Sequence, residues 1–162
     1  MSQPLLIRDA MRIGVPTCKL WDPVALVAAQ MAGGGHTAVV VLDEDGDTRG
    51  WINERMLAEA WPRLEGGREL VAGDIMDEQV PECPSDVPLS VAVQVMADFG
   101  ADHLFFLHRA GGRVWPASVL NLGDIVRAAA GPDFLAGQGI AAPRPTPMDL
   151  FRERYRKPSK AG

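Results

Sequence analysis

The chain has 162 residues, of which 47% are hydrophobic and 23% charged, and its formal net charge is -5. This composition is typical of a globular protein, and the negative balance supplies no general field that attracts nucleic acid. No apolar run approaches the roughly 20 residues needed to span a bilayer, the first residues lack a signal-peptide pattern, and two cysteines are too few for a secreted disulfide framework. We therefore expect a cytoplasmic protein with reduced thiols and no membrane association.

An internal repeat organises the sequence. Residues 8–11 (RDAM) recur as residues 73–76 (GDIM), an offset of 65 (73 − 8). The same offset relates six identical pairs: Val15 and Val80, Pro16 and Pro81, Cys18 and Cys83, Met31 and Met96, Gly35 and Gly100, and Gly46 and Gly111. Agreement in one register over this length indicates a duplication. The predicted division is a first repeat at 5–60, a linker at 61–71, a second repeat at 72–130 and a tail at 131–162.

Each copy predicts the same series of elements. In the first copy these are an extended piece (15–19), a helix that ends at glycines (22–34), a buried strand (37–43), a turn (43–47), a second strand (48–53) and a closing helix (54–61). In the second copy the same elements are predicted over 80–84, 86–100, 103–108, 109–112, 113–121 and 122–131. The short apolar runs at 37–43 and 103–108 have no helical period, so we expect both strands to be buried on both faces.

The second copy has two features of its own. The predicted inward face of its first helix consists of Val91, Val95, Met96 and Phe99, and Gly100 is the expected stop. Its hairpin carries a three-residue insertion, because 111–118 spans 7 positions where 46–50 spans 4. Pro116 lies in this insertion and cannot donate to a sheet ladder, which predicts an edge position or a bulge.

The element pattern predicts an α+β fold. Neither β-α-β-β-α copy would bury its apolar strands alone, so we expect the two repeats to pack with pseudo-twofold symmetry. A flexible tail is expected to follow, Gly- and Pro-rich at first and basic at its end. Residues 141–162 contain six Lys or Arg against two acids.

The acidic segment 43–54 matches a calcium-binding loop only in part. Asp43, Asp45, Asp47 and Glu54 fall at positions 1, 3, 5 and 12 of that pattern. Thr48, however, occupies the position of the required turn glycine, and a predicted strand precedes the segment where a helix is needed. We therefore interpret the segment as a solvated hairpin turn.

The sequence offers little for catalysis. His36, His103 and His108 do not have the spacing of metal ligands, and Cys18 and Cys83 sit in apolar surroundings typical of buried, unreactive thiols. No serine-nucleophile, phosphate-loop or dinucleotide-binding motif is found. We predict that the protein is not an enzyme and has no catalytic residue and no metal site.

The most informative position is the junction of strand and helix in the second copy. Asn121 precedes the predicted helix and Asp124 is its third residue. A capping box explains the pair, and so does a polar ligand bound at the helix N-terminus; the spacing leaves both interpretations open. The corresponding residues of the first copy are Asn53 and Met56, so a carboxylate occurs in one copy alone.

The repeat unit resembles a CBS domain. The resemblance rests on D-I-M before a strand, a helix ending M-x-x-x-G, a buried strand that runs to an acid-glycine turn, and the pattern G-h-h-T-x-x-D (h, hydrophobic). Two such units in tandem resemble a Bateman module, over residues 5–130 and with no catalytic domain attached. The resemblance implies a stand-alone regulatory sensor that binds AMP, ADP, ATP or S-adenosylmethionine in clefts between its units and forms homodimers of modules. It implies no cofactor.

The resemblance also implies site residues. In such modules the T-x-x-D acid accepts hydrogen bonds from ribose hydroxyls, a task suited to a carboxylate. Asp124 is then the ribose acid and Asn121 replaces the threonine. The other implied residues of this site are Val80, Glu82 and Cys83 by the base, His103 near the phosphates and Phe105 at the cleft wall. The first repeat is implied to hold a degenerate site of Asn53, Thr17 and Val15, because Met56 cannot accept a hydroxyl hydrogen bond.

Two alternatives stay open. The chain could be a degenerate CBS pair that acts only as a dimerisation or protein-interaction module. The basic tail could in that case contact a partner or nucleic acid through Arg152, Arg154, Arg156 and Lys157. The expected partners are a second copy of the chain and an effector protein that reads its state, whereas nucleic acid is not expected.

Overall fold

The computed structural model describes residues 4–131, so the predicted tail beyond Gly131 lies outside the described residues. Within them the chain divides into two compact units. Unit 1 consists of 4–13, 83–106 and 118–131, and unit 2 consists of 14–82 and 107–117. No helix among the described residues has the length and apolar character needed to cross a membrane.

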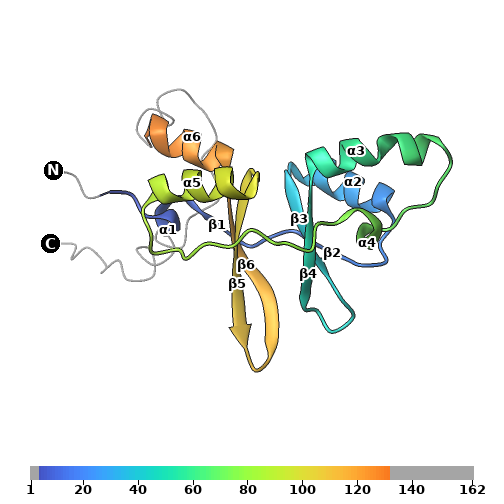
Figure 1. The fold of residues 1–162 in the computed structure, drawn as a ribbon, viewed down its shortest axis with the longest axis horizontal. Helices are drawn as coiled ribbons and strands as arrows, with labels where there is room; N and C mark the ends of the chain where they lie inside the picture. The colour runs from blue at the N-terminus through green and yellow to red at the C-terminus, as the bar shows by residue number, and fades with distance from the viewer. Residues whose placement is uncertain (1–3, 132–162) are drawn as a thin grey trace, which may run out of the picture. The chain divides into compact units, whose positions relative to one another are not determined.

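Unit 2 contains most of the first repeat. Its elements are β2 (Thr17–Lys19), α2 (Val24–Gly34), β3 (Ala38–Leu42), β4 (Thr48–Asn53), α3 (Glu54–Glu65) and α4 (Ala72–Ile75) (Figure 1). The sheet order is β2-β3-β4, with β2 parallel and β4 antiparallel to β3. Val39, Val40 and Val41 of the central strand are fully buried, which confirms the prediction for this apolar run.

Unit 1 contains most of the second repeat. Its elements are α1 (Ile7–Ala10), β1 (Arg12–Ile13), α5 (Leu89–Phe99), α6 (Leu122–Ala130) and the helix-proximal parts of β5 (His103–Ala110) and β6 (Arg113–Asn121). The sheet order is β1-β6-β5 (Figure 1). Leu104, Leu120, Ala92 and Met96 form its core together with Ile7 from the N-terminal segment. As predicted, Gly100 ends α5 in the left-handed conformation, with φ 60°.

The opening segment of each repeat packs on the other repeat's sheet. In unit 1, Arg12 of β1 pairs with Val119 of β6. In unit 2, Asp77 pairs with Trp51 of β4. The two pairs are equivalent, because Asp77 follows Arg12 by the repeat offset of 65 and Val119 follows Trp51 by that offset plus the three inserted residues. Gly50 permits the approach in unit 2, because a Cβ there would lie 2.7 Å from the backbone oxygen of Asp77. The compact units therefore cut across the predicted repeat boundaries.

Several local predictions were wrong. Residues 61–65 continue α3 through Pro62 instead of starting the linker. On α5 Met96 is buried and Val95 packs against the core as predicted, but Ala92 is buried in place of Val91 and Phe99, which are exposed. Strand β5 is buried only over its first three residues, because its second half leaves the core of unit 1 as part of the long hairpin.

Candidate ligand site at the start of helix α6

Asp124 caps the helix in which it lies. The side chain of Asn121 accepts a hydrogen bond from the backbone N–H of Asp124 (2.9 Å), and Asp124 Oδ2 accepts one from the N–H of Asn121 (3.0 Å). The extended backbone of Asn121 and the helical backbone after it bring the two groups together. The capping interpretation of this pair is therefore confirmed, although capping alone does not decide whether the carboxylate also binds a ligand.

Two arginines lie against the same carboxylate. Arg12 of β1 donates through Nε to Asp124 Oδ1, and Nη1 of Arg127, one turn along α6, lies 3.6 Å from that oxygen. The side chain of Asp124 is 2% exposed and that of Arg12 is 17% exposed. Sequence reasoning missed both arginines. Arg127 could have been found from its i+3 spacing, whereas Arg12 is 112 residues away and is brought in by the exchanged N-terminal segment.

His103 and Phe105 lie on β5 in the same unit. His103 is buried, and its Nδ1 lies 2.6 Å from Oδ1 of Asp102. The rings of His103 and Phe105 are nearly parallel, with centroids 6.2 Å apart. Phe105 is fully buried. Alternate residues of a strand share a face, which explains why the two rings lie on one side of β5.

The three residues implied by the resemblance to lie near the base are divided between the units. Cys83 belongs to the core of unit 1, whereas Val80 and Glu82 belong to unit 2. Glu82 accepts two hydrogen bonds of 2.7 Å from the guanidinium of Arg109. The structure thus brings Asp124, Asn121, His103, Phe105 and Cys83 into one unit and assigns a protein partner to Glu82.

The implied degenerate site of the first repeat lies in unit 2. Asn53 caps α3 by accepting from the N–H of Met56 (2.9 Å), just as Asn121 caps α6. Met56 packs against the core of this unit. Thr17 pairs with Val40 in the sheet, and Val15 is partly buried ahead of β2. A separate cavity of about 340 Å³ lies between α2 and α3, lined by Met31, Ala32, His36, Glu54 and Leu57 among others.

Both cysteines are free, buried thiols, as predicted. Burial raises the pKa of Cys18 from 9.0 to about 12, with a smaller contribution from Asp22. Burial also raises the pKa of Cys83, again with a contribution from a nearby acid, Asp86. Because the thiolate is the nucleophilic form, neither cysteine is suited to nucleophilic catalysis at neutral pH.

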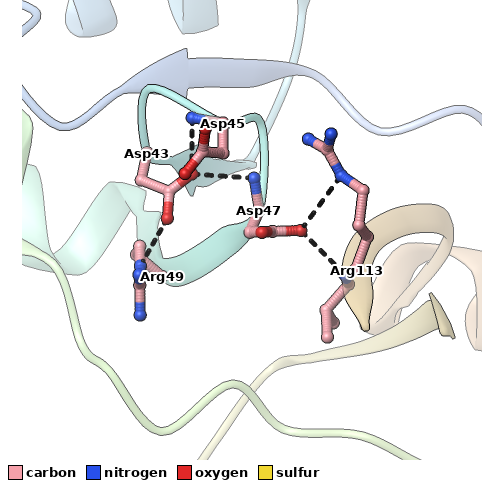
Figure 2. Close-up of polar contacts among 6 residues, drawn as sticks. Asp43, Asp45, Asp47, Arg49 and Arg113 are labelled. Carbon is pink, nitrogen blue, oxygen red and sulfur yellow. Dashed lines mark hydrogen bonds and ion pairs between the residues drawn. The ribbon is translucent and has the colours of Figure 1, made fainter. Parts of the chain in front are cut away.

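The acidic turn is held by its own backbone and by arginines. The carboxylate of Asp43 accepts from the N–H groups of Asp45 (3.0 Å) and Asp47 (2.9 Å) and from Arg49 Nε (2.7 Å), as Figure 2 shows. The hydrogen bond from Asp47, helped by Arg49, holds the pKa of Asp43 below its usual value. Asp47 in turn accepts from the N–H of Val114 (2.9 Å), and Arg113 Nε lies 3.7 Å away.

Hydrogen bonds to backbone N–H groups and to arginine give this turn its structural role. No cluster of His, Cys, Asp or Glu in the described chain is arranged to hold a metal ion. Asp43 is buried, so the description of the turn as solvated was wrong for this residue. The buried carboxylate replaces backbone partners that the tight turn would otherwise lack.

The fold is that of a tandem CBS-domain pair. No protein-family model and no curated protein matches the chain. A CBS-domain-containing protein from Agrobacterium tumefaciens is 20% identical, with a TM-score of 0.68 over 80% of this chain and 96% of that one. A conserved CBS-domain protein from Thermoplasma acidophilum is 19% identical, with a TM-score of 0.65 over 85% and 78%. These similarities confirm the predicted fold class.

A third structure bears on ligands. It is a CBS-domain pair solved in complex with 5′-methylthioadenosine and S-adenosyl-L-methionine, and its sequence is 18% identical to this chain. The TM-score is 0.66, and the match covers 80% of this chain and 98% of the other. The ligands are properties of that protein; for this chain the similarity defines the fold.

Proposed function

We propose that the protein is a non-catalytic regulatory module that binds an adenosine compound at Asp124 and signals binding through altered packing. The observation that carries the proposal is a carboxylate at the start of α6 in a CBS-pair fold, where the first repeat has Met56 instead. A carboxylate can accept hydrogen bonds from two neighbouring ribose hydroxyls, and a thioether cannot do so with comparable strength. The second repeat is therefore the one equipped to hold a ribose.

The ligands of the related CBS-domain pair support the class of compound. Both 5′-methylthioadenosine and S-adenosyl-L-methionine contain adenosine. Signalling requires that the ligand binds one packing arrangement of the module better than another, because a ligand without that preference shifts no equilibrium. An effector protein that distinguishes the two arrangements would complete the regulation.

A thermal-shift experiment tests this function. The full chain is heated with AMP, ADP, ATP or S-adenosylmethionine at millimolar concentration. A ligand at 100 times its dissociation constant adds about 2.7 kcal/mol to the free energy of unfolding, so we expect a clear rise in the melting temperature with at least one compound. Guanosine monophosphate serves as the control for nonspecific effects. No rise with any adenosine compound would refute the sensor function.

A second candidate function is dimerisation without a small ligand. Leu26 on α2 and Val91 on α5 occupy equivalent positions of the two repeats, and they are 54% and 40% exposed. Paired apolar positions on the corresponding helices would suit a second copy of the chain, because an internal duplication supplies two similar contact faces.

The double variant Leu26→Glu with Val91→Glu tests this candidate. If these faces form the dimer, light scattering should give twice the chain mass for the natural protein and the monomer mass for the variant. Trp115→Gln, an exposed apolar site on β6, is the control and should leave the mass unchanged. A monomeric natural protein, or a variant that remains dimeric, would contradict the candidate.

A further inference from the structure

The carboxylate assigned to the ribose is already occupied by groups of this chain. Oδ2 of Asp124 accepts a hydrogen bond from the backbone N–H of Asn121, and Oδ1 accepts one from Nε of Arg12, with Arg127 close by. With 2% of the side chain exposed, two ligand hydroxyls cannot reach Asp124 in this arrangement. The contact with Asn121 belongs to the helix cap and Arg127 lies beyond hydrogen-bonding distance, so Arg12 is the group that a ribose would displace.

Displacing Arg12 has an electrostatic cost. Its side chain is only 17% exposed, and a partly buried guanidinium that loses its carboxylate is poorly compensated by water. A ligand that brings its own anion offsets that cost by giving Arg12 a new partner. A neutral nucleoside such as adenosine, or a neutral thioether nucleoside such as 5′-methylthioadenosine, does not.

The surrounding charges favour the same exchange. Arg127 lies on α6 one turn beyond Asp124, and the N-terminus of this nine-residue helix adds a partial positive charge at Asp124. Asp102, the residue just before β5, lies within hydrogen-bonding distance of His103. Guanidinium groups bind phosphate through paired N–H donors, which makes an arginine suited to this role.

We infer that Arg12 restricts the ligand at Asp124 to adenosine compounds that carry a phosphate. In the ligand-free chain Arg12 pairs with Asp124, and in the bound chain it pairs with the phosphate while the ribose takes the carboxylate. The inference rests on the proposed function, and it narrows the ligand class from adenosine compounds to adenosine nucleotides. Arg12 would therefore act as a specificity-determining residue.

Calorimetric titrations with AMP, adenosine and 5′-methylthioadenosine test the inference, because the last two compounds carry no anion. For the natural chain we expect AMP to bind at least about tenfold more tightly than either of the other two compounds. In Arg12→Met the apolar stem is kept and the competitor for Asp124 is removed. Adenosine should therefore bind more tightly than to the natural chain, and the preference for AMP should fall to nearly onefold.

Two further variants control the test. Arg12→Lys retains the charge and should restore part of the preference for AMP, which separates a role in specificity from damage to the fold. Arg8→Met removes an exposed arginine from α1 of the same segment and should leave the preference unchanged. Circular dichroism confirms that each variant is folded before titration.

The possible failures are distinguishable. If adenosine or 5′-methylthioadenosine binds the natural chain as tightly as AMP, or Arg12→Met keeps the preference for AMP, the inference about Arg12 is wrong and the adenosine sensor stands. If none of the three compounds binds either the natural chain or Arg12→Met, the proposed function itself is wrong.

Discussion

Asp124→Ala is expected to lower the free energy of unfolding by about 3 kcal/mol. The substitution removes the acceptor for the N–H of Asn121 and leaves the largely buried Arg12 without its carboxylate. Loss of a helix cap alone typically costs about 1 kcal/mol, and an uncompensated buried charge accounts for the rest. Urea denaturation followed by circular dichroism measures the change.

Asp74→Ala is the matched control. Asp74 caps α4 by accepting from the N–H of Val71 (2.9 Å), in the same geometry as Asp124 but at an exposed position and, among residues 4–131, without an arginine partner. We expect its removal to cost only about 1 kcal/mol. If the two substitutions cost the same, the contact between Arg12 and Asp124 contributes nothing to stability, and the argument that a ligand must overcome it fails.

Asp124→Asn separates the two roles of the carboxylate. The amide oxygen still accepts the hydrogen bond from Asn121, so most of the cap is retained, whereas the charge that attracts Arg12 is lost. We expect this variant to lose about 2 kcal/mol through the uncompensated Arg12, and loss of the response to adenosine compounds in the folded variant would show that the ligand also needs the charge. An unchanged response would leave Asp124 with a structural role alone.

The duplication made the fold predictable from the sequence. One offset aligned two series of strands and helices. The apolar run at 37–43 forms a largely buried strand as its composition indicates, whereas the run at 103–108 is buried only over its first three residues. The caps at Asn53 and Asn121 could be predicted because they depend on residues three positions apart. Such local signals are contained in short stretches of sequence.

What the sequence did not predict depends on contacts between distant segments. The predicted boundaries assign 5–60 and 72–130 to separate repeats, whereas β1 joins the sheet of the second repeat and Asp77 pairs with that of the first. The exchange places Arg12 beside Asp124. It also pairs Asp77 with β4, the strand that precedes the helix carrying Met56. Asp124 thus has an arginine at the exchanged position of its unit, whereas the equivalent position in the unit of Met56 is Asp77. This difference becomes visible only once the pairing of the strands is known.

Phe105→Ala is expected to cost about 3 to 5 kcal/mol of unfolding free energy. The side chain is fully buried, and its removal leaves a cavity that the surrounding strand cannot close completely. Phe99→Ala removes the same side chain from a position that is 53% exposed on α5, and it should cost no more than about 0.5 kcal/mol. Thermal or urea unfolding of the two variants measures the difference.

Phe105→Val then decides whether this ring also contacts a ligand. The equivalent residue of the first repeat is Val40, which is fully buried as well, so valine is compatible with this place in the sheet. If Phe105 is only a core residue, Phe105→Val should lose stability while the folded fraction binds AMP with unchanged affinity. If the ring lies against the adenine base, AMP affinity should fall about tenfold, because aromatic stacking on a base contributes about 1 to 3 kcal/mol. Full burial of the ring favours the first result.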